Sequence, residues 1–404
     1  MATALELTAV DGIRLGTVCA GIKTPGRKDL VLIEMAPETA CAAVFTRNAF
    51  CAAPVIIARD NLAKGPGEPR YLLINTGNAN AGTGQEGLDH CRACIQAVSS
   101  HAGVTFEQVL PFSTGVIGEA LPVQKICGAI PSAFDALASN GWADAAEGIL
   151  TTDTRAKGFS VSFSSAGQDY VVTGIGKGAG MIRPNMATML AYLATDMAID
   201  QALLQEMLSA AMETSFHRIT VDGDTSTNDA CVLMATGQAG NKCVTDADTQ
   251  QYLDLREAVE AVCVLLAQAL VRDGEGASKF VTVKVGGGAT EQECLDVAFT
   301  VAHSPLVKTA LFASDPNWGR ILAAIGRAGL NNLNVNQVAV YLNDILIAEN
   351  GCRAVSYTEE QGVAAMAPED IVIRIELQRG DSQVQVWTSD FSYDYVRINA
   401  EYRS

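Results

Sequence analysis

Short runs of β-branched and other apolar residues alternate along this chain with longer segments rich in alanine and leucine. Short apolar runs favour buried strands, whereas apolar residues spaced three or four positions apart favour helices. The strand-like runs are 31–36, 41–46, 53–58, 71–75, 231–237, 280–287, 338–343, 371–377 and 384–390, and the segments 109–122 and 170–182 are predicted to be strands that run into glycine-containing turns. Residues 75–87 are predicted to form a turn-rich loop. The helix-like segments are 88–102, 141–154, 199–215 with Asp200 in its first turn, 249–270 and the two ends of 307–329. This alternation predicts a mixed α/β fold.

The chain has 404 residues, which exceeds the usual size of a single domain, ~100–200 residues. We therefore expect either two lobes or one large intertwined domain. Hydrophobic residues make up 49% of the sequence and charged residues 18%, which is typical of a globular protein. The sequence contains no Pro- or Ser-rich linker, so no boundary between lobes is visible in it.

The net charge of −17 argues against binding to nucleic acid, because a phosphate backbone attracts clustered Lys and Arg. The N-terminal residues lack a basic segment followed by a long apolar one, so we expect no signal or transit peptide. Long apolar stretches, such as 261–270, are too short to span a bilayer. The sequence thus predicts a soluble, cytoplasmic protein without membrane association.

The eleven cysteines are interpreted as reduced thiols, mostly small buried apolar residues. Cys91 and Cys94 have CxxC spacing beside His90, but a zinc site needs a second pair of ligands at suitable spacing, and none follows. We expect neither a metal nor a bound cofactor.

A glycine-rich stretch at 177–180 leads to Thr188, and none of the four histidines lies near this threonine in sequence. A threonine can use its own α-amino group as the base if the peptide bond before it is cut, because that amine has an ordinary pKa of ~7.7–8.0. Ala187 is small enough to leave its carbonyl open to attack, and Pro184 restricts the chain upstream. On these residues alone, a buried threonine without catalytic function remains the alternative. The glycines match neither a dinucleotide-binding fingerprint nor a P-loop.

Several motifs, taken together, support the hypothesis that Thr188 is a nucleophile released by cleavage. They are NTGNANAGTG (75–84), PFSTGVIGE (111–119), ILTTDT (149–154), KGAGMIRPNMATMLAYLATD (177–196), TVDGDTSTND (220–229), RDGEGASKF (272–280) and DPNWGRI (315–321). In this order they resemble the ornithine acetyltransferase family, also called the glutamate N-acetyltransferase family, of arginine biosynthesis. The resemblance extends from the loop near residue 75 to the C-terminus.

The resemblance implies self-cleavage between Ala187 and Thr188, giving an α chain (1–187) and a β chain (188–404) that stay associated, in a heterotetramer of two α and two β chains. It implies an α/β layered sandwich similar in kind to the N-terminal-nucleophile hydrolases. Thr188 would be the nucleophile, and Thr114 with Gly115 would stabilise the oxyanion. The implied substrate contacts are Thr151, Lys177, Thr188, Glu275, Asn399 and Ser404. Lys177 suits a substrate carboxylate and Glu275 an ammonium group.

The implied reaction moves the acetyl group of N2-acetylornithine through Thr188 to L-glutamate, giving L-ornithine and N-acetylglutamate. Acetyl-CoA as an additional donor would make the enzyme bifunctional, and we favour this reading. Two other hypotheses are a self-processing amidase or aminopeptidase, in which water resolves the acyl-enzyme, and a binding protein that never cleaves.

Some residues keep two interpretations. Asp222, Asp224 and Asp229 could hold Mg²⁺ or Ca²⁺, but a loop near the active site is favoured over that site. His217 is interpreted as structural, and Trp318 and Arg320 either cover the site or pack a helix end.

Overall fold

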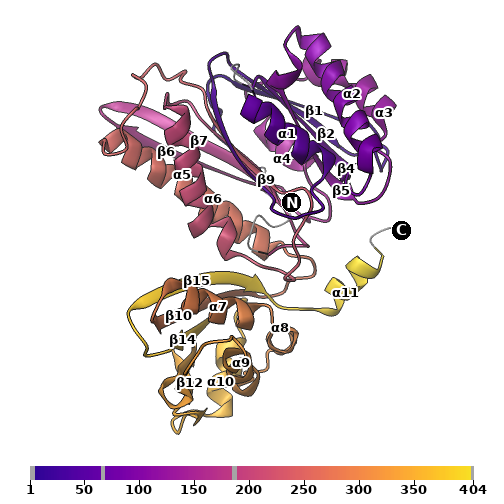
Figure 1. The fold of residues 1–404 in the computed structure, drawn as a ribbon. Coiled ribbons are helices and arrows are strands. Elements are labelled where there is room, and N and C mark those ends of the chain that lie inside the picture. The colour runs from indigo at the N-terminus through magenta and orange to yellow at the C-terminus, as the bar shows by residue number, and fades with distance from the viewer. Residues whose placement is uncertain (1–4, 65–68, 184–188, 402–404) are drawn as a thin grey trace. The chain divides into compact units, whose positions relative to one another are not determined.

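The computed structural model describes residues 5–64, 69–183 and 189–401. The chain divides into two compact units (Figure 1). Unit 1 comprises residues 1–178, 185–217 and 224–270, and unit 2 comprises residues 179–184, 218–223 and 271–404. Because the chain passes between the units several times, no single linker separates them, which agrees with the absence of a linker in the sequence.

Unit 1 contains two sheets. The four-stranded sheet has the order β1-β2-β4-β5 and consists of β1 (Ile13–Val18), β2 (Leu30–Met35), β4 (Tyr71–Asn78) and β5 (Val109–Val116). The five-stranded sheet has the order β3-β9-β8-β7-β6 and consists of β3 (Ala40–Phe45), β9 (Ala230–Ala235), β8 (Leu190–Thr195), β7 (Gln168–Lys177) and β6 (Lys157–Ser165). Pairing is antiparallel except for β4 with β5 and β8 with β9.

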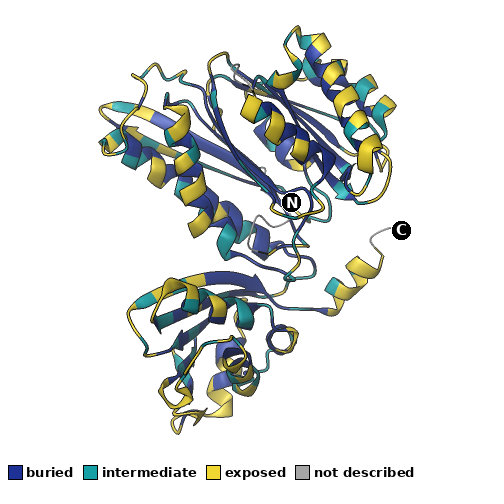
Figure 2. Cartoon of the chain, viewed as in Figure 1, coloured by how far each residue is buried: buried dark blue, intermediate teal, exposed yellow. Residues whose placement is uncertain are grey.

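The alternation of side chains along each strand builds the core between these sheets. In β2, Val31 and Ile33 belong to the cluster that also contains Tyr192 and Val232 of the second sheet. Leu30, in the same strand, belongs instead to the cluster formed with the outer helices. Both faces of β2 are therefore buried (Figure 2).

Helices cover the outer faces of both sheets in unit 1. The first sheet is covered by α1 (Ala53–Lys64), α2 (Gly84–Ala102) and α3 (Val123–Asp135), and the second by α5 (Gln201–Thr214) and α6 (Gln250–Arg272). The short helix α4 (Trp142–Gly148) adds Trp142 to the core between the sheets. Unit 1 is thus a four-layer α/β/β/α sandwich, which confirms the predicted fold class.

Unit 2 has one six-stranded sheet in the order β13-β12-β11-β14-β10-β15. Its strands are β10 (Phe280–Gly288), β11 (Ala339–Leu342), β12 (Ile345–Glu349), β13 (Cys352–Arg353), β14 (Asp370–Glu376) and β15 (Ser382–Ser389). Its helices are α7 (Glu291–Ala302), α8 (Pro305–Phe312), α9 (Trp318–Gly326), α10 (Glu359–Met366) and α11 (Tyr393–Ala400). Val281, Val283 and Val285 of β10 lie in its core together with residues of α7 and α9.

The prediction of a strand at 53–58 is wrong, because these residues begin helix α1. The apolar run suggested a strand, but the buried positions Val55, Ala58 and Asn61 recur at helical spacing, and Ile56 is exposed. Pro54 is also acceptable in a first helical turn, where backbone N–H groups have no partner within the helix.

The predicted loop at 75–87 is shorter than expected. Strand β4 continues to Asn78, and α2 begins at Gly84. The sequence analysis did not identify β1, β6, β8, β12, β13, α3, α7, α10 or α11.

Helix α5 confirms the predicted helix at 199–215. Asp200 is its N-cap, and the carboxylate accepts hydrogen bonds from the N–H groups of Ala202 and Leu203, at 2.9 and 3.3 Å. These bonds satisfy two N–H groups that the first turn leaves without intrahelical partners.

We predict that Asp200→Ala lowers the local opening free energy of α5 by ~1 kcal/mol, because both capping bonds disappear. Native-state hydrogen exchange of the first amides of α5 measures this quantity. Glu206→Ala is the control, since Glu206 is exposed on the same helix and alanine favours helices. Equal exchange in the two variants would contradict a capping role for Asp200.

Candidate active site

Thr114 and Gly115 lie near the carboxyl end of β5, where this strand pairs in parallel with β4. Thr114 is buried. Gly115 has φ +136°, and a Cβ atom placed on it would lie 2.3 Å from the carbonyl carbon of Gly77. The backbones of β5 and β4 approach so closely here that only glycine fits at position 115, and the Thr-Gly pair of the sequence supplies it.

Lys177 ends β7, and its Nζ atom donates a hydrogen bond to Thr114 Oγ1 at 3.1 Å. The lysine side chain is among the largest that are fully buried in the protein. Two predicted site residues that are distant in sequence are therefore in direct contact. Because it is buried, Lys177 is not a solvated surface charge.

Asp153 is a site residue that the sequence analysis missed, although it lies in the quoted ILTTDT motif. It accepts hydrogen bonds from Lys157 Nζ at 2.8 Å, from Gly178 N–H at 2.7 Å and from Thr151 N–H at 3.1 Å. The carboxylate therefore links the segment of Thr151 to the end of β7, where Lys177 lies.

The Asp153 carboxyl and the Lys157 ammonium are both buried. Burial alone would raise the pKa of Asp153, but the charges of Lys177 and Lys157 and the hydrogen bonds from Lys157 and Gly178 hold that pKa well below its usual range. Asp153 is accordingly ionised and compensates the buried positive charges.

Buried asparagines fix the backbone beside Thr114. Asn228 donates through Nδ2 to the carbonyl oxygens of Ala79 and Ser113, at 2.6 and 2.9 Å. Ser113 in turn donates to Asn75 Oδ1 at 2.6 Å. The asparagines of NTGNANAGTG and TVDGDTSTND thus brace the strand that carries Thr114, a role that turn propensity alone did not indicate.

The predicted nucleophile Thr188 and its neighbour Ala187 lie outside the described residues. The next residue, Met189, is buried, and its N–H donates to Asp229 Oδ1 at 3.0 Å. Asp229 is itself fully buried and is influenced by the charge of Lys177. The residue that follows Thr188 in sequence is thus held beside the group that contains Lys177 and Thr114.

Glu275 and Asn399 are together in unit 2. Asn399 Nδ2, on α11, donates to Glu275 Oε2 at 2.7 Å. A Cβ atom on Gly180 would lie 2.5 Å from the same oxygen, so glycine at this position leaves room for the carboxylate. Ser404 lies outside the described residues. The predicted contacts therefore form two groups, Thr114, Gly115, Thr151 and Lys177 in unit 1 and Glu275 with Asn399 in unit 2.

Cys91 and Cys94 are buried in the apolar core around α2, as expected for small apolar residues. His217 lies in the short turn after α5, and its Nδ1 atom is 3.0 Å from the Oε1 atom of Glu213, in the last turn of that helix. Arg320 donates to the Leu306 carbonyl at 2.7 Å, and Trp318 packs on the core of unit 2, so both residues pack a helix end.

Asp222 accepts hydrogen bonds from the N–H groups of Met181 and Ile182, at 2.6 and 3.0 Å, within unit 2. It thus holds backbone, whereas Asp229 holds Met189 in unit 1. Among the residues that the structure describes, no three His, Cys, Asp or Glu side chains gather as a metal site would require.

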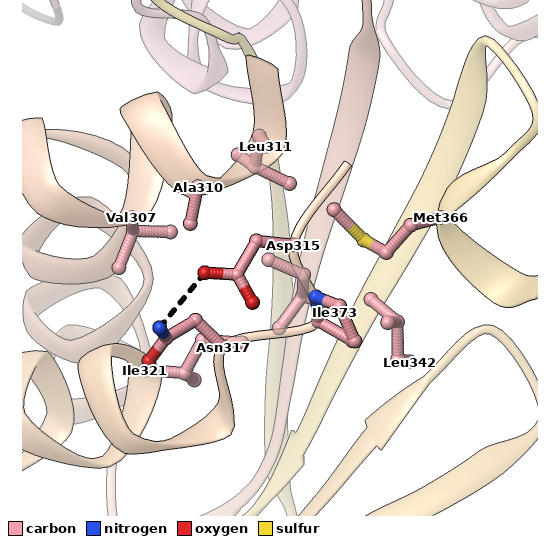
Figure 3. Close-up of a pocket in the computed structure, with 10 residues that line it drawn as sticks. Val307, Ala310, Leu311, Asp315, Asn317, Ile321, Leu342, Met366 and Ile373 are labelled. Atoms are coloured by element: carbon pink, nitrogen blue, oxygen red, sulfur yellow. Dashed lines mark hydrogen bonds between the residues drawn. The ribbon is translucent and has the colours of Figure 1, made fainter. Parts of the chain in front are cut away.

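A pocket in unit 2 lies among apolar side chains of α8, α9 and the sheet, beside a hydrogen bond from Asn317 to Asp315 (Figure 3). Its volume of about 10 Å³ leaves room for about one water molecule, so it holds no substrate. In the described part of the chain, no helix has both the length and the apolar character needed to cross a bilayer.

The chain matches the ArgJ family over residues 14–404. It is 57% identical to the arginine biosynthesis bifunctional protein ArgJ of Pseudomonas syringae pv. tomato and 56% identical to that of Pseudomonas fluorescens, over 98% of each chain. The chain is also similar to the crystal structure of the arginine biosynthesis bifunctional protein ArgJ from Bacillus halodurans, with 38% sequence identity and a TM-score of 0.50. The match covers 52% of this chain and 98% of the Bacillus halodurans chain.

The α/β/β/α sandwich and the match of these relatives along nearly the whole chain identify an acyltransferase of arginine biosynthesis. The chain belongs to the ArgJ family. This confirms the family and the class of enzyme that the sequence motifs predict.

We predict that Gly115→Ala destabilises unit 1 by ~1–3 kcal/mol, because the new Cβ atom would overlap the backbone of Gly77 and Asn78. Chemical denaturation followed by fluorescence measures the loss. Gly118→Ala is the matched control, since Gly118 also has positive φ, at +83°, but its Cβ would meet no atom within 4 Å. A larger loss at Gly118 would contradict the proposed overlap.

Asp153→Asn should destabilise the protein by ~3–5 kcal/mol at neutral pH, because it leaves the buried ammonium groups of Lys157 and Lys177 uncompensated. The native pKa of Asp153 is depressed, so its contribution is complete above the unfolded pKa, ~3.9, and is lost as pH falls through the native pKa. The free energies of unfolding of the variant and the wild type should therefore differ most above about pH 4, as chemical denaturation at several pH values would measure.

Asp144→Asn serves as the control, because Asp144 pairs with Lys28 at an exposed position. It should leave unfolding unchanged. A pH-independent difference between Asp153→Asn and wild type would show that the charge of Asp153 is not what stabilises the site.

Proposed function

We propose that the protein cleaves itself between Ala187 and Thr188 and then transfers the acetyl group of N2-acetylornithine to L-glutamate through an acetyl-Thr188 enzyme. The observation that carries the proposal is the buried contact of Lys177 with Thr114, beside Asp229 and the N–H of Met189. Asp229 holds the N–H of Met189, the residue that directly follows Thr188 in the chain, and Lys177 pairs with the next residue, Leu190, which supports a catalytic role for this part of the chain.

In the first half-reaction, the Thr188 hydroxyl attacks the acetyl carbonyl, and its proton passes to the α-amine of the same residue. The tetrahedral intermediate expels the α-nitrogen of ornithine, which takes up that proton, and leaves an ester on Thr188. In the second half-reaction, the amine of glutamate attacks the ester, which forms N-acetylglutamate and returns the hydroxyl.

Thr114 and Gly115 are proposed to stabilise the oxyanion in both half-reactions. Because Thr114 Oγ1 accepts a hydrogen bond from Lys177, the hydroxyl hydrogen of Thr114 points elsewhere and can be donated to the oxyanion. The Lys177 charge adds a favourable potential for the negative oxygen in this dry environment.

For substrate recognition, we propose that Lys177 and Thr151 bind the substrate carboxylate and that Glu275 binds an ammonium group, with Asn399 and Ser404 completing the contacts. The hydrogen bond from Asn399 orients the Glu275 carboxylate, which supports a binding role for this carboxylate. An amino-acid acceptor supplies both charges, which favours the transferase over an amidase that uses water.

The pairing within the five-stranded sheet supports lasting association of the two chains after cleavage. Strands β3, β6 and β7 belong to residues 1–187, whereas β8 and β9 belong to residues 188–404. Strand β8 pairs with β7 over six residues, from Val172 with Thr195 to Lys177 with Leu190. The Bacillus halodurans chain, matched over nearly its full length, covers about half of this chain, as a processed α or β chain would.

We further propose that acetyl-CoA can acetylate Thr188 in place of N2-acetylornithine, since the same acetyl-enzyme serves both donors. The bifunctional designation of the relatives supports a second activity. No resident cofactor is proposed. The heterotetramer of two α and two β chains and the cytoplasmic location stay predictions.

We predict that purified wild-type protein runs as two fragments of 187 and 217 residues on a denaturing gel, and as one species under native conditions. Incubation with N2-acetylornithine should place an acetyl group on the peptide that begins at Thr188, detected by mass spectrometry. Thr188→Ala should stay full-length, folded and inactive, because the hydroxyl that it removes is the nucleophile in both self-cleavage and acetyl transfer.

Thr188→Ser is the matched variant, since it retains a hydroxyl and should still cleave and transfer acetyl groups at a reduced rate. An active wild-type protein that remains a single intact chain refutes the processing. Release of acetate from the acetyl-enzyme in the presence of glutamate, without N-acetylglutamate, would assign the amidase instead.

A further inference from the structure

Asp229 immediately precedes β9 and is 1% exposed. Its Oδ1 atom accepts the hydrogen bond from Met189 N–H. Its Oδ2 atom is also buried but accepts no hydrogen bond within the described part of the chain. Since a buried carboxylate oxygen without a partner is costly, a donor for Oδ2 is expected.

The backbone around Asp229 is fixed on both sides. Ala230 N–H donates to the Met189 carbonyl at 3.1 Å, and Thr46 N–H donates to the Asp229 carbonyl at 2.9 Å. From Leu190 with Ala230 onward, β8 and β9 continue this pairing in parallel. The carboxyl group therefore stays at the start of β8 and has little freedom to turn toward solvent.

Thr188 is covalently attached to the nitrogen atom that Asp229 holds. Its α-nitrogen is separated from that atom by three covalent bonds of the backbone. Self-cleavage would turn it from an amide into an amine with hydrogens to donate. A donor for Oδ2 would thus arise close to this atom.

The groups that face Asp229 come from several elements. Burial raises the pKa of Asp229 well above its usual range, whereas the Met189 N–H, the charge of Lys177 and the Ser226 side chain act in the opposite direction. The half-buried thiol of Cys51, in the segment before α1, is also influenced by Asp229. A further cation beside the carboxyl would favour its charged form.

We propose that Asp229 is the positioning residue of the Thr188 α-amine, with Oδ1 holding Met189 N–H and Oδ2 accepting a hydrogen bond from the amine that cleavage releases. This inference rests on the proposed function, because it requires a free amine on Thr188. Asp229 acts through that amine, which it aims toward the Thr188 hydroxyl whose proton the amine receives.

A carboxylate beside the amine favours the ammonium form and raises the pKa at which the amine becomes a free base. Asp229→Asn keeps an oxygen for Met189 N–H but removes the charge and the second acceptor. The amine should then lose its proton at lower pH. The acidic limb of kcat/KM should shift down by ~1 pH unit or more, while kcat falls ~10–100-fold because the amine is no longer aimed.

The experiment uses residues 1–187 co-expressed with residues 188–404 that begin at a free Thr188, so that a processing defect does not obscure turnover. The pH profile of acetyl transfer is recorded, and the pKa of the Thr188 amine is measured by competitive labelling with acetic anhydride. Thermal unfolding checks that each pair is folded.

Asp196→Asn is the matched control. Asp196 follows the opposite end of β8 and, like Asp229, accepts a backbone N–H, that of Val171 at 3.1 Å. Burial raises the pKa of this carboxyl as well. This variant should keep the wild-type pH profile and amine pKa.

A folded Asp229→Asn pair whose acidic limb and amine pKa match wild type overturns the inference. If this variant does not fold, the pKa of the Thr188 amine in the folded wild-type pair tests the inference. An amine pKa at or above its value in urea supports a carboxylate partner, and a lower value, as burial alone would give, overturns it. Failure of the proposed function is distinct, since wild type itself would then form no acetyl-Thr188 peptide.

Discussion

The burial of the Lys177 ammonium is the constraint on which the arrangement of unit 1 depends. A charged group in a protein interior is stable only when it is paired and hydrogen-bonded. Thr114 accepts a hydrogen bond from the lysine, and the ionised carboxylate of Asp153 supplies nearby negative charge. Each of these residues comes from a different part of the chain, so compensating one lysine brings together the end of β7, the end of β5 and the segment that contains Asp153.

This arrangement explains why polar motifs are placed at strand ends. Asp153 binds the backbone at Gly178, and Asn228 binds the backbone at Ser113. These hydrogen bonds fix the two segments whose side chains meet, Lys177 and Thr114. The rigid β sheets set the distances, and the buried polar side chains set the orientation of the strand ends.

The sequence predicted the strands and helices with strong apolar periodicity, including β2, β9 and α5. It failed at 53–58 because a short β-branched run is equally apolar in a strand and in a buried helix face. The family motifs predicted Thr114, Gly115 and Lys177 as site residues, and the structure brings Thr114 and Lys177 into contact. Asp153 was not predicted as a site residue, and Asp229 was predicted only as part of a loop near the active site. An aspartate in a polar turn is normally solvated, and only the fold shows that these two are buried.

The five-stranded sheet has a genetic consequence. Strands on either side of the proposed cleavage site alternate in space, because β8 lies between β7 and β9, and β9 lies between β8 and β3. Two chains that share a sheet in this way separate only by unfolding. In a cell that carries two alleles, each α chain would therefore remain with the β chain from the same translation product. Defects in the two halves of the gene would not be repaired by exchange of chains between alleles.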